Sequence, residues 1–451
     1  MVVRENSQPG TPGFSLSGKR FGDDKKAQIA GYASSTSVAP GEDLDFHVSV
    51  ATAQEYRIHV YRVGQYGGSG GRLIAVSPWL PGHTQQAPIV DPETRMVRCG
   101  WTAGWRLRVG RDWVSGYYLA LLTNAAGWCR WVPFLVRDPG RPAAGLVIVP
   151  TSTYQAYNMW PYDQRTGASL YYGFDSSGRK VSSRRAAAVS HDRPHTGSGV
   201  PSQATQDIGF TQWIERYGAD VTYASSEDLD GGRVDLTRYR AVIFCGHDEY
   251  WTVAMRQRAV AARDSGTSLV FLSANNCYWR IRYGLSDRAP DGRIVACSKS
   301  MPRAGQDIPL MTQWRHAGSP EQTFIGAQYV SMVDGYADLV VQDSGHWFWA
   351  GTGVRDGDRI PRVIWGEADQ VMPDVPVPSS RENGVLASSP YVRKGNQQHA
   401  HTTLYRAPSG SWVFAAGSMG WTAALQSGES ADERIQQATR NLLDRLLSVS
   451  R

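Results

Sequence analysis

Three short, uninterrupted apolar runs in the second part of the chain limit most strongly what it can fold into. They cover residues 145–149, 239–245 and 267–272, and amphipathic patterns typical of helices lie between them at 207–217 and 252–265. A strand that is apolar at every position is typically buried on both faces. Such strands alternating with helices indicate a mostly parallel sheet with helices on both sides. The sequence therefore predicts an α/β fold here, a mostly parallel, Rossmann-like domain of three layers.

The residues before this region follow the pattern of an all-β domain. Residues 44–50 and 56–62 alternate apolar and polar side chains, and glycine-rich turns such as residues 67–71 separate the runs. Short strands with frequent turns are typical of a β-sandwich. We divide the chain into a flexible tail (1–26), an all-β sandwich-like domain (27–137), a linker (138–144) and an α/β catalytic domain (145–451), with a long loop at 176–203 and a candidate insertion at 284–342.

Charge and cysteine content argue against several classes of protein. The 451 residues carry a net charge of +6, but the excess arginines accompany no recognisable motif, so we expect no nucleic-acid partner. There is no run of roughly 18 uncharged apolar residues and no apolar signal segment at the N-terminus, so we expect neither membrane insertion nor secretion. The five cysteines form no CxxC pair, which argues against a cysteine-based zinc site and favours reduced thiols in the cytoplasm.

Polar and aromatic residues follow the predicted strands at the point where each one ends. Five such segments occur, at 153–158, 246–251, 273–280, 366–369 and 417–421. Because ligands of open α/β sheets bind outside the carboxyl ends of the strands, we expect a functional site at this edge. The residues that would line a substrate pocket there, with core packing as the alternative for the aromatic rings, are Tyr154, Tyr157, Asn158, Trp251, Trp279 and Trp421.

The segment at 246–251 carries the most chemistry. His247, Asp248 and Glu249 stand beside Tyr250 between a strand and a helix, where acidic residues also suit the first turn of the helix. The alternative to such a structural role is a metal site or an acid–base site. The strand ends supply phenol and carboxylate oxygens rather than paired His or Cys ligands, and these oxygens suit a hard cation such as Fe(III). Two phenolates and one carboxylate would also neutralise its charge.

Three of these segments resemble the large (beta) subunit family of N,N-dimethylformamidase. They are Gly-His-Asp-Glu-Tyr-Trp at 246–251, Asn-Asn-Cys-Tyr-Trp-Arg at 275–280 and Gly-Glu-Ala-Asp at 366–369. Weaker similarities, such as Gly-Tyr-Ala-Ser-Ser-Thr-Ser at 31–37, extend over almost the whole length. The characterised enzyme has a longer large subunit and a separate small subunit, and no small subunit is evident in this sequence.

The resemblance implies a metal-dependent amidohydrolase that cleaves the C–N bond of a small-molecule amide, either an N-substituted formamide or a larger biosynthetic amide. It implies a mononuclear Fe(III) held by two tyrosines and one glutamate, which by motif would be Tyr250, Tyr278 and Glu367. Self-association into a homo-oligomer is left open. The candidate catalytic residues, for proton transfer and for stabilising the oxyanion, are His247, Glu249, Asn275 and Asn276.

Two other interpretations of the same residues stay open. Cys245 ends a buried strand directly before the turn that holds His247, an arrangement that a metal-independent Cys/His amidohydrolase could use. A non-enzymatic binding module could instead use an aromatic cleft to hold a sugar or a peptide. Activity that survives Cys245→Ala would exclude the first, and a tightly bound stoichiometric metal would argue against the second.

Overall fold

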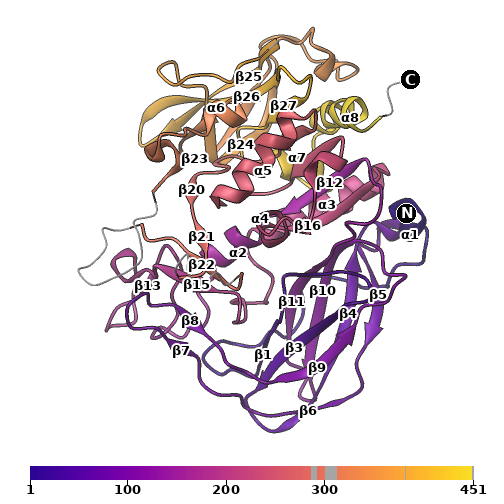
Figure 1. The fold of residues 1–451 in the computed structure, drawn as a ribbon, viewed down its shortest axis with the longest axis vertical. Helices are drawn as coiled ribbons and strands as arrows, with labels where there is room; N and C mark the ends of the chain where they lie inside the picture. Colours follow the sequence, from indigo (N-terminus) through magenta and orange to yellow (C-terminus); the bar gives the residue numbers. More distant parts are fainter. Residues whose placement is uncertain (286–291, 300–311, 381, 449–451) are drawn as a thin grey trace.

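The N-terminal part is built from mainly antiparallel strands in two sheets. The computed structural model describes residues 1–285, 292–299, 312–380 and 382–448, and Figure 1 shows their arrangement. The first sheet has the order β1 (Ile29–Ala33), β3 (Asp43–Val50), β9 (Ala103–Arg108). The second has the order β2 (Ser37–Val38), β11 (Cys129–Val136), β10 (Gly116–Asn124), β4 (Gln54–Val63), β5 (Gly71–Val76), with β6 (Leu80–Gly82) paired to β4.

The alternating pattern of these strands explains the N-terminal core. In β3, Leu44, Phe46 and Val48 are buried while the residue just before each of them is not. These side chains meet others from the second sheet, such as Ile58 of β4 and Ala120 of β10. A two-residue period therefore fills the space between the two sheets.

The C-terminal part is organised around a seven-stranded sheet. Its order is β16 (Val221–Ser225), β12 (Gly145–Val149), β17 (Ala241–Phe244), β19 (Ser268–Phe271), β27 (Trp412–Ala415), β26 (Asn396–Arg406), β25 (Glu382–Arg393). The first five strands run parallel to one another. β26 pairs antiparallel with β27, and β25 pairs antiparallel with β26. Every residue of β12, β16, β17 and β19 is buried, as expected of strands covered on both faces.

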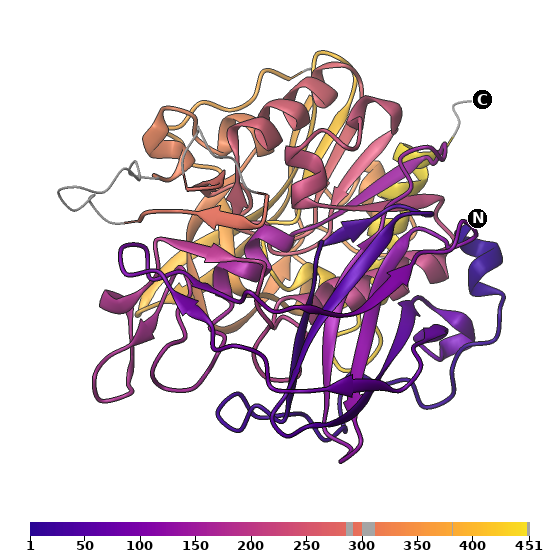
Figure 2. The same ribbon diagram turned by 60° about the horizontal axis from the view of Figure 1, so that its bottom comes forward.

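Helices cover the two faces of this sheet. They are α2 (Thr151–Tyr157), α3 (Ala204–Tyr217), α4 (Ser226–Asp230), α5 (Val253–Asp264), α6 (Gln322–Ile325), α7 (Trp421–Leu425) and α8 (Glu433–Leu447). Val147 and Val149 of β12 pack in a core shared with α3, α7 and α8, whereas Leu146 and Ile148 pack in one shared with α4 and α5. The N-terminal strands lie against the first of these cores, to which Tyr117 of β10 contributes (Figure 2).

Short additional sheets surround the central one. They are β7 (Ile89–Val90) with β8 (Val97–Arg98), β13 (Gly173–Phe174) with β14 (Lys180–Val181), β15 (Ala188–Ser190) with β22 (Ile294–Ala296) and β21 (Arg282–Tyr283), and β18 (Tyr250–Trp251) with β20 (Trp279–Arg280). A long antiparallel pair, β23 (Gln328–Val340) with β24 (Arg359–Gln370), packs beside β25 and β26. None of the helices in the described part of the chain has the length and apolar character needed to cross a membrane.

The prediction of a mostly parallel, Rossmann-like three-layer α/β fold is wrong. Strands account for 36% of the chain and helices for 19%, and the strands are spread over many small sheets. The physical reason lies in residues 328–406, where four long antiparallel strands take the place of further strand–helix repeats. The buried apolar runs identified strands of the sheet centre, but they carried no information about the strands added at its edge.

The first 26 residues, which we expected to form a flexible tail, are packed against the rest of the chain. They include α1 (Val2–Asn6), in which the side chain of Val2 is buried. Glu5 accepts a hydrogen bond of 2.8 Å from Tyr66 and forms an ion pair with Arg72. The expected loop at 176–203 contains the short strands β14 and β15, and the candidate insertion at 284–342 lies partly outside the described residues.

Candidate active site

The candidate site lies where the order of the parallel strands reverses. The chain passes from β12 to β16 on one side of the sheet and then returns to β17 on the other side of β12. Side chains that follow the carboxyl ends of β12 and β17 therefore meet at a natural crevice. Tyr157 at the end of α2 and Glu249 in the turn after β17 meet in this place.

A buried carboxylate forms the centre of the site. Glu249 accepts hydrogen bonds from the hydroxyls of Tyr157 (2.7 Å) and Tyr171 (2.6 and 2.7 Å to its two oxygens). The two hydroxyls are themselves 2.9 Å apart, and the side chain of Glu249 is 2% exposed. The backbone N–H of Glu249 donates to Thr153, which fixes the turn against α2. Three oxygen-bearing side chains from separate segments thus converge, with the carboxylate buried and the two tyrosines half-buried.

His247 lies beside this group and is held in one orientation. Its Nδ1 is 3.1 Å from the carbonyl oxygen of Ala274, and its Nε2 lies 3.4 Å from Glu249 and 3.5 Å from Glu367. Burial alone would lower the pKa of His247, but the carboxylates of Glu367 and Glu249 outweigh burial and raise that pKa to about 9. The site therefore favours an imidazolium whose Nε2–H points at two carboxylates.

Glu367 brings a second carboxylate from β24. Its Oε2 is buried and has no hydrogen-bond partner among the described residues. Burial is the first cause of its raised pKa, and the charge of Glu249 acts in the same direction. His247 Nε2, 3.5 Å away, is the charged group that faces this oxygen, so an ion pair holds the carboxylate in its buried position.

Lys299 provides a positive charge in the same place. Its Nζ donates to the hydroxyl of Tyr250 at 2.6 Å and lies 3.5 Å from the ring centroid of Tyr171 and 4.5 Å from that of Trp279. Burial lowers the pKa of Lys299, although the charge of Glu249 opposes this effect. The ammonium is thus held by aromatic faces next to the carboxylates.

Comparison with known proteins identifies the family. The model of the family described as N,N-dimethylformamidase beta subunit-like, C-terminal, matches residues 57–436. This chain belongs to that family. The resemblance found in the sequence is therefore confirmed, and membership suggests an amide hydrolase.

Other comparisons add no argument. No curated protein matches the chain. Among solved structures, a Paenibacillus sp. cycloisomaltooligosaccharide glucanotransferase complexed with cycloisomaltoheptaose shows 8% identity and a TM-score of 0.17, covering 86% of this chain and 68% of its own. A similarity of that size supports no inference about fold or function.

The three residues assigned as ligands by motif contact different neighbours. Tyr250 is fully buried and donates nothing to Glu367 or Tyr278; its hydroxyl contacts Lys299. Tyr278 packs edge-on against Tyr329 and lies 5.1 Å under the guanidinium of Arg315. In the described part of the chain, no hydrogen bond or ion pair joins any two of the three residues first assigned as ligands.

Most of the predicted substrate-binding residues have their described contacts outside the group around Glu249. Trp251 packs at tilted angles on Phe244 and Phe271, and Trp421 packs on Phe348 and Phe414, all inside the core. Tyr154 donates to the buried carboxyl of Asp207, and Asn158 donates to Gln155 and to the carbonyl oxygen of Pro194. Of the six candidates, Tyr157 and Trp279 are the two with contacts inside the site.

Both predicted asparagines lie close to the site, in different environments. The backbone N–H of Asn275 donates to Asp369 at 2.8 Å, and its side chain hydrogen-bonds Glu367. Asn275 has φ of 56°, a left-handed conformation that Asn tolerates better than most residues. Asn276 is buried, and neither side-chain atom has a partner among the described residues.

The metal-independent interpretation finds no support at Cys245. Its thiol donates to the carbonyl oxygen of Ile148 at 3.5 Å, away from the site. Burial, followed by the charge of Asp207, raises the pKa of the thiol well above its usual range. Because the thiolate is the nucleophilic form, this cysteine is a poor nucleophile.

Oxygen-bearing side chains converge in a set that the sequence did not single out as a group. Among the described residues, no group of three or more His, Cys, Asp and Glu side chains is arranged to hold a metal ion. The convergent set is instead Tyr157, Tyr171 and Glu249, in which two of the donors are phenols. Burial and the charge of Glu249 raise the pKa of both tyrosines, so that only a strong Lewis acid would ionise them.

Tyr171 and Lys299 are the site residues that sequence reasoning missed. Tyr171 stands in an irregular stretch between α2 and β13, and Lys299 follows β22. Neither follows the carboxyl end of a strand of the central sheet, and the site residues were predicted from that position. The paired tyrosines at 171 and 172 are the one local hint, since an aromatic pair before a glycine is unusual in a polar loop.

Proposed function

We propose that this protein is an iron-dependent hydrolase of the C–N bond of small amides, and that Tyr157, Tyr171 and Glu249 hold a mononuclear Fe(III). The observation that carries the proposal is the convergence of two tyrosine hydroxyls on one glutamate, at 2.6–2.7 Å. Two tyrosines and one glutamate are the ligand types that the family resemblance implies. This set differs from the assignment made by motif to Tyr250, Tyr278 and Glu367, which stays the alternative prediction.

The chemistry of the donors fits this ion. Ionised phenols and a carboxylate are hard oxygen ligands, and together they carry three negative charges, equal to the charge of Fe(III). When bound, the ion would polarise the amide carbonyl and lower the pKa of water. The buried position of Glu249 strengthens such charge pairing, because the local dielectric constant is low.

The side chains around these ligands can move the protons that hydrolysis requires. Glu367, whose pKa is raised first by burial, can accept a proton from the attacking water. His247 can donate its Nε2 proton to the nitrogen that leaves as the amine. The carbonyl oxygen of Ala274 holds the other ring nitrogen, so that Nε2 keeps facing the two carboxylates.

Two further groups support the reaction in this scheme. The positive charge of Lys299 stabilises the negative site and holds the hydroxyl of Tyr250. Asn275, next to Glu367, can donate to the oxyanion that forms when water attacks the amide. The rings of Tyr278 and Trp279 are half-buried and contact each other, and their aromatic surface suits the alkyl groups of an N-substituted formamide.

The test is amine release from N,N-dimethylformamide, N-methylformamide and N-butylformamide by the iron-loaded full-length chain. We expect turnover of at least one amide, and loss of activity by about 10³-fold or more in Glu249→Gln, because a ligand and its charge are removed. The matched control is Glu55→Gln, an exposed glutamate on β4. Absence of amine release from every amide, with iron bound, would contradict the proposal.

A further inference from the structure

The substituent on the amide nitrogen lies on one side of the candidate active site in the proposed reaction. His247 gives its Nε2 proton to this nitrogen, and Nε2 lies 3.5 Å from Glu367. Glu367 stands on β24, which pairs with β23. The surface that these two strands form beside Glu367 therefore decides which N-substituents the site accepts.

A bulge in β23 turns two large side chains to the side of Glu367. Met332 pairs in register with Glu367, and Tyr329 pairs with Asp369, two residues further along β24. Side chains directly opposite each other on neighbouring strands lie on the same face of a sheet, with Cβ atoms about 5 Å apart. Residues three positions apart in a regular strand point to opposite faces, but the register shift after Tyr329 inserts one extra residue. Tyr329 and Met332 therefore share the face of Glu367.

The opposite face of the two strands is closed by the protein itself. Val333 of β23 and Ala368 of β24 are both buried in the same hydrophobic core. They directly follow Met332 and Glu367, and successive side chains of a strand point to opposite faces. Met332 therefore points away from the core, and 47% of it is exposed.

The apolar surface around Met332 continues into the candidate active site. The ring of Tyr329 is half-buried and packs edge-on against Tyr278, with ring centroids 5.3 Å apart. Burial raises the pKa of Tyr329, and the charges of Glu367 and Glu249 act in the same direction, so the phenol lies within electrostatic range of both carboxylates. An exposed methionine in this position differs from apolar side chains that are scattered singly over a surface.

The chemistry of this face favours a neutral aromatic group. Methionine sulfur makes favourable contacts with ring edges, and aromatic rings pack edge-to-face against each other. Both acidic residues of β23 are in ion pairs, Asp334 with Arg393 at 2.6 Å and Asp338 with Arg359 at 3.0 Å. The strand thus offers apolar contact to a ligand and leaves neither of its own charges unpaired.

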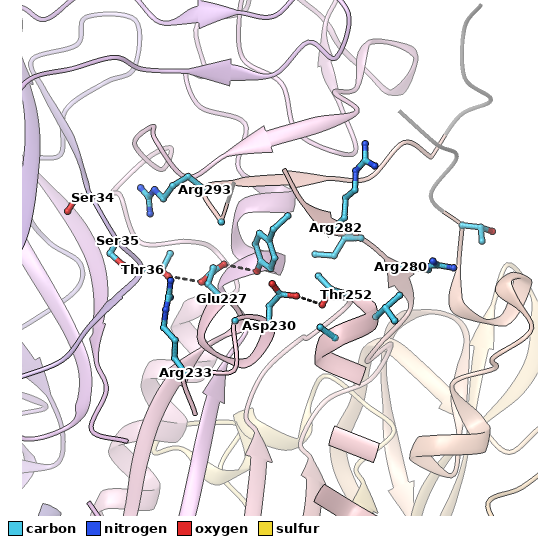
Figure 3. Close-up of a pocket in the computed structure, with 17 residues that line it drawn as sticks. Ser34, Ser35, Thr36, Glu227, Asp230, Arg233, Thr252, Arg280, Arg282 and Arg293 are labelled. Atoms are coloured by element: carbon cyan, nitrogen blue, oxygen red, sulfur yellow. Dashed lines mark hydrogen bonds between the residues drawn. The ribbon is translucent and has the colours of Figure 1, made fainter. Parts of the chain in front are cut away.

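The largest cavity near the sheet does not offer such a surface. It has a volume of about 770 Å³, and its walls include the charged side chains of Glu227, Asp230 and Arg233 (Figure 3). The described residues that line it do not include Glu249 or Glu367. An apolar substituent on the amide nitrogen therefore finds its contacts on the face of β23 and β24.

We propose that the substrate carries an aromatic ring on its amide nitrogen, and that Tyr329 and Met332 bind this ring. The inference rests on the proposed function, because the position of the nitrogen is taken from His247. A linker of two carbon atoms suits the separation of about 5 Å between opposite side chains of the two strands. In N-(2-phenylethyl)formamide, water adds to the formyl carbon, the C–N bond breaks, and the nitrogen leaves as 2-phenylethylamine with the proton from His247, while the formyl group becomes formate.

The test compares N-(2-phenylethyl)formamide with N-methylformamide as substrates of the iron-loaded full-length chain. We expect kcat/KM to be about 10–100-fold higher for the aromatic amide, mainly through a lower KM, as the burial of one ring gives. N-methyl-2-phenylacetamide, an isomer that carries the ring on its acyl side, should not show the lower KM. Equal kcat/KM for the two formamides would overturn the proposal, and an equally low KM for the isomer would overturn the placement of the ring on the nitrogen side.

Variants assign the preference to the two side chains. Met332→Ala and Tyr329→Ala should each reduce the preference for the aromatic amide by about tenfold, with kcat for N-methylformamide unchanged. Met332→Leu and Tyr329→Phe keep the apolar surface and should keep the preference. The matched control is Ile89→Ala, at a residue of the N-terminal part that is 70% exposed, and it should behave as the parent does. An unchanged preference in both alanine variants would overturn the proposal.

Calorimetry with the same iron-loaded chain separates this inference from the proposed function. If neither formamide is hydrolysed, saturable binding of N-(2-phenylethyl)formamide that is weakened in Met332→Ala supports the aromatic subsite, and only the proposed function fails. Hydrolysis of both formamides with equal KM leaves the proposed function standing and overturns the subsite. Absence of both hydrolysis and saturable binding overturns the two together.

Discussion

His247 is the residue on which proton transfer in the proposed reaction depends. Its Nε2 faces Glu249 and Glu367 at 3.4 and 3.5 Å, and no other histidine in the described part of the chain lies within 4 Å of either carboxylate. We expect His247→Asn to reduce kcat/KM for the amide by about 10²–10⁴-fold, the usual contribution of an acid–base group, while iron content stays unchanged. Amine release and metal analysis on the same preparation check both parts. His83→Asn, at an exposed position, should retain full activity, and loss of iron in His247→Asn would assign this residue to the ligands.

Asp207 makes the free energy of unfolding depend on pH. Burial raises the pKa of this carboxyl from 3.8 to about 7, and Tyr154 donates a hydrogen bond to it. Because the folded state binds the proton more tightly than the unfolded state, this contribution to stability is fully present below pH 4 and is lost as the pH rises towards 7.

We therefore expect the free energy of unfolding to fall by at most about 1.4 kcal/mol per pH unit over that interval because of Asp207. Asp248 and Asp369 have pKa values raised by burial to about 8 and about 7, and they contribute in the same direction. Urea unfolding between pH 4 and 8 should thus show a shallower decline in Asp207→Asn than in the parent. An identical slope in both would contradict the buried, protonated state, and Asp112→Asn, at an exposed aspartate, is the control.

At the scale of elements, local patterns located the strands and helices of the sheet centre. Residues 145–149 form β12, and the helix expected at 252–265 is α5, with Thr252 as its cap. The segment after β17 was also placed correctly at the carboxyl edge of the sheet, which is why His247 and Glu249 were found. These features could be predicted because each depends on residues close together in sequence.

What escaped prediction depends on contacts between distant segments. Tyr171 reaches Glu249 across 78 positions, and its own loop has no periodic pattern. Glu367 was found by motif. The strand that carries it, β24, pairs antiparallel with β23 in an irregular register, and the sequence showed no turn pattern that would predict this pair. Tyr250 was assigned as a ligand from the family motif, and that assignment stays a prediction.

The cap of α5 offers a direct test of local energetics. The Thr252 side chain accepts from the Met255 amide at 3.1 Å and donates to Asp230 at 2.5 Å. We expect Thr252→Ala to lower the free energy of unfolding by about 1–2 kcal/mol, the usual cost of losing such a cap, and Thr252→Ser to restore most of it. Urea unfolding measures both. A serine variant as unstable as the alanine variant would show that the methyl group, rather than the hydroxyl, stabilises the helix.

At the scale of the whole molecule, a buried ion pair joins the N-terminal strands to the C-terminal part. Arg62 of β4 and Glu215 of α3 lie 2.7 Å apart, and both side chains are 0% exposed. Tyr223 and Asn6 also donate to Glu215. The ion pair therefore links two segments that are 153 positions apart in the sequence.

We expect Glu215→Gln to destabilise the chain by about 3–5 kcal/mol, because it leaves the guanidinium of Arg62 buried without its counter-charge. The double variant Arg62→Met/Glu215→Leu should be less destabilised than the sum of the two single variants, since it leaves no isolated charge. A double-mutant cycle in urea measures this difference. Strict additivity of the two single changes would contradict a coupled buried pair.

The central claim is the identity of the iron ligands, and metal content measured with visible absorption tests it most directly. The parent chain loaded with ferric iron should hold about one iron per chain and show a tyrosinate-to-iron charge-transfer band. Tyr157→Phe and Tyr171→Phe should each lose the band and most of the iron, while Tyr250→Phe and Tyr278→Phe should keep both. Retention of iron and colour in Tyr157→Phe and Tyr171→Phe, with their loss in Tyr278→Phe, would contradict the site built around Glu249 and restore the ligands first assigned by motif.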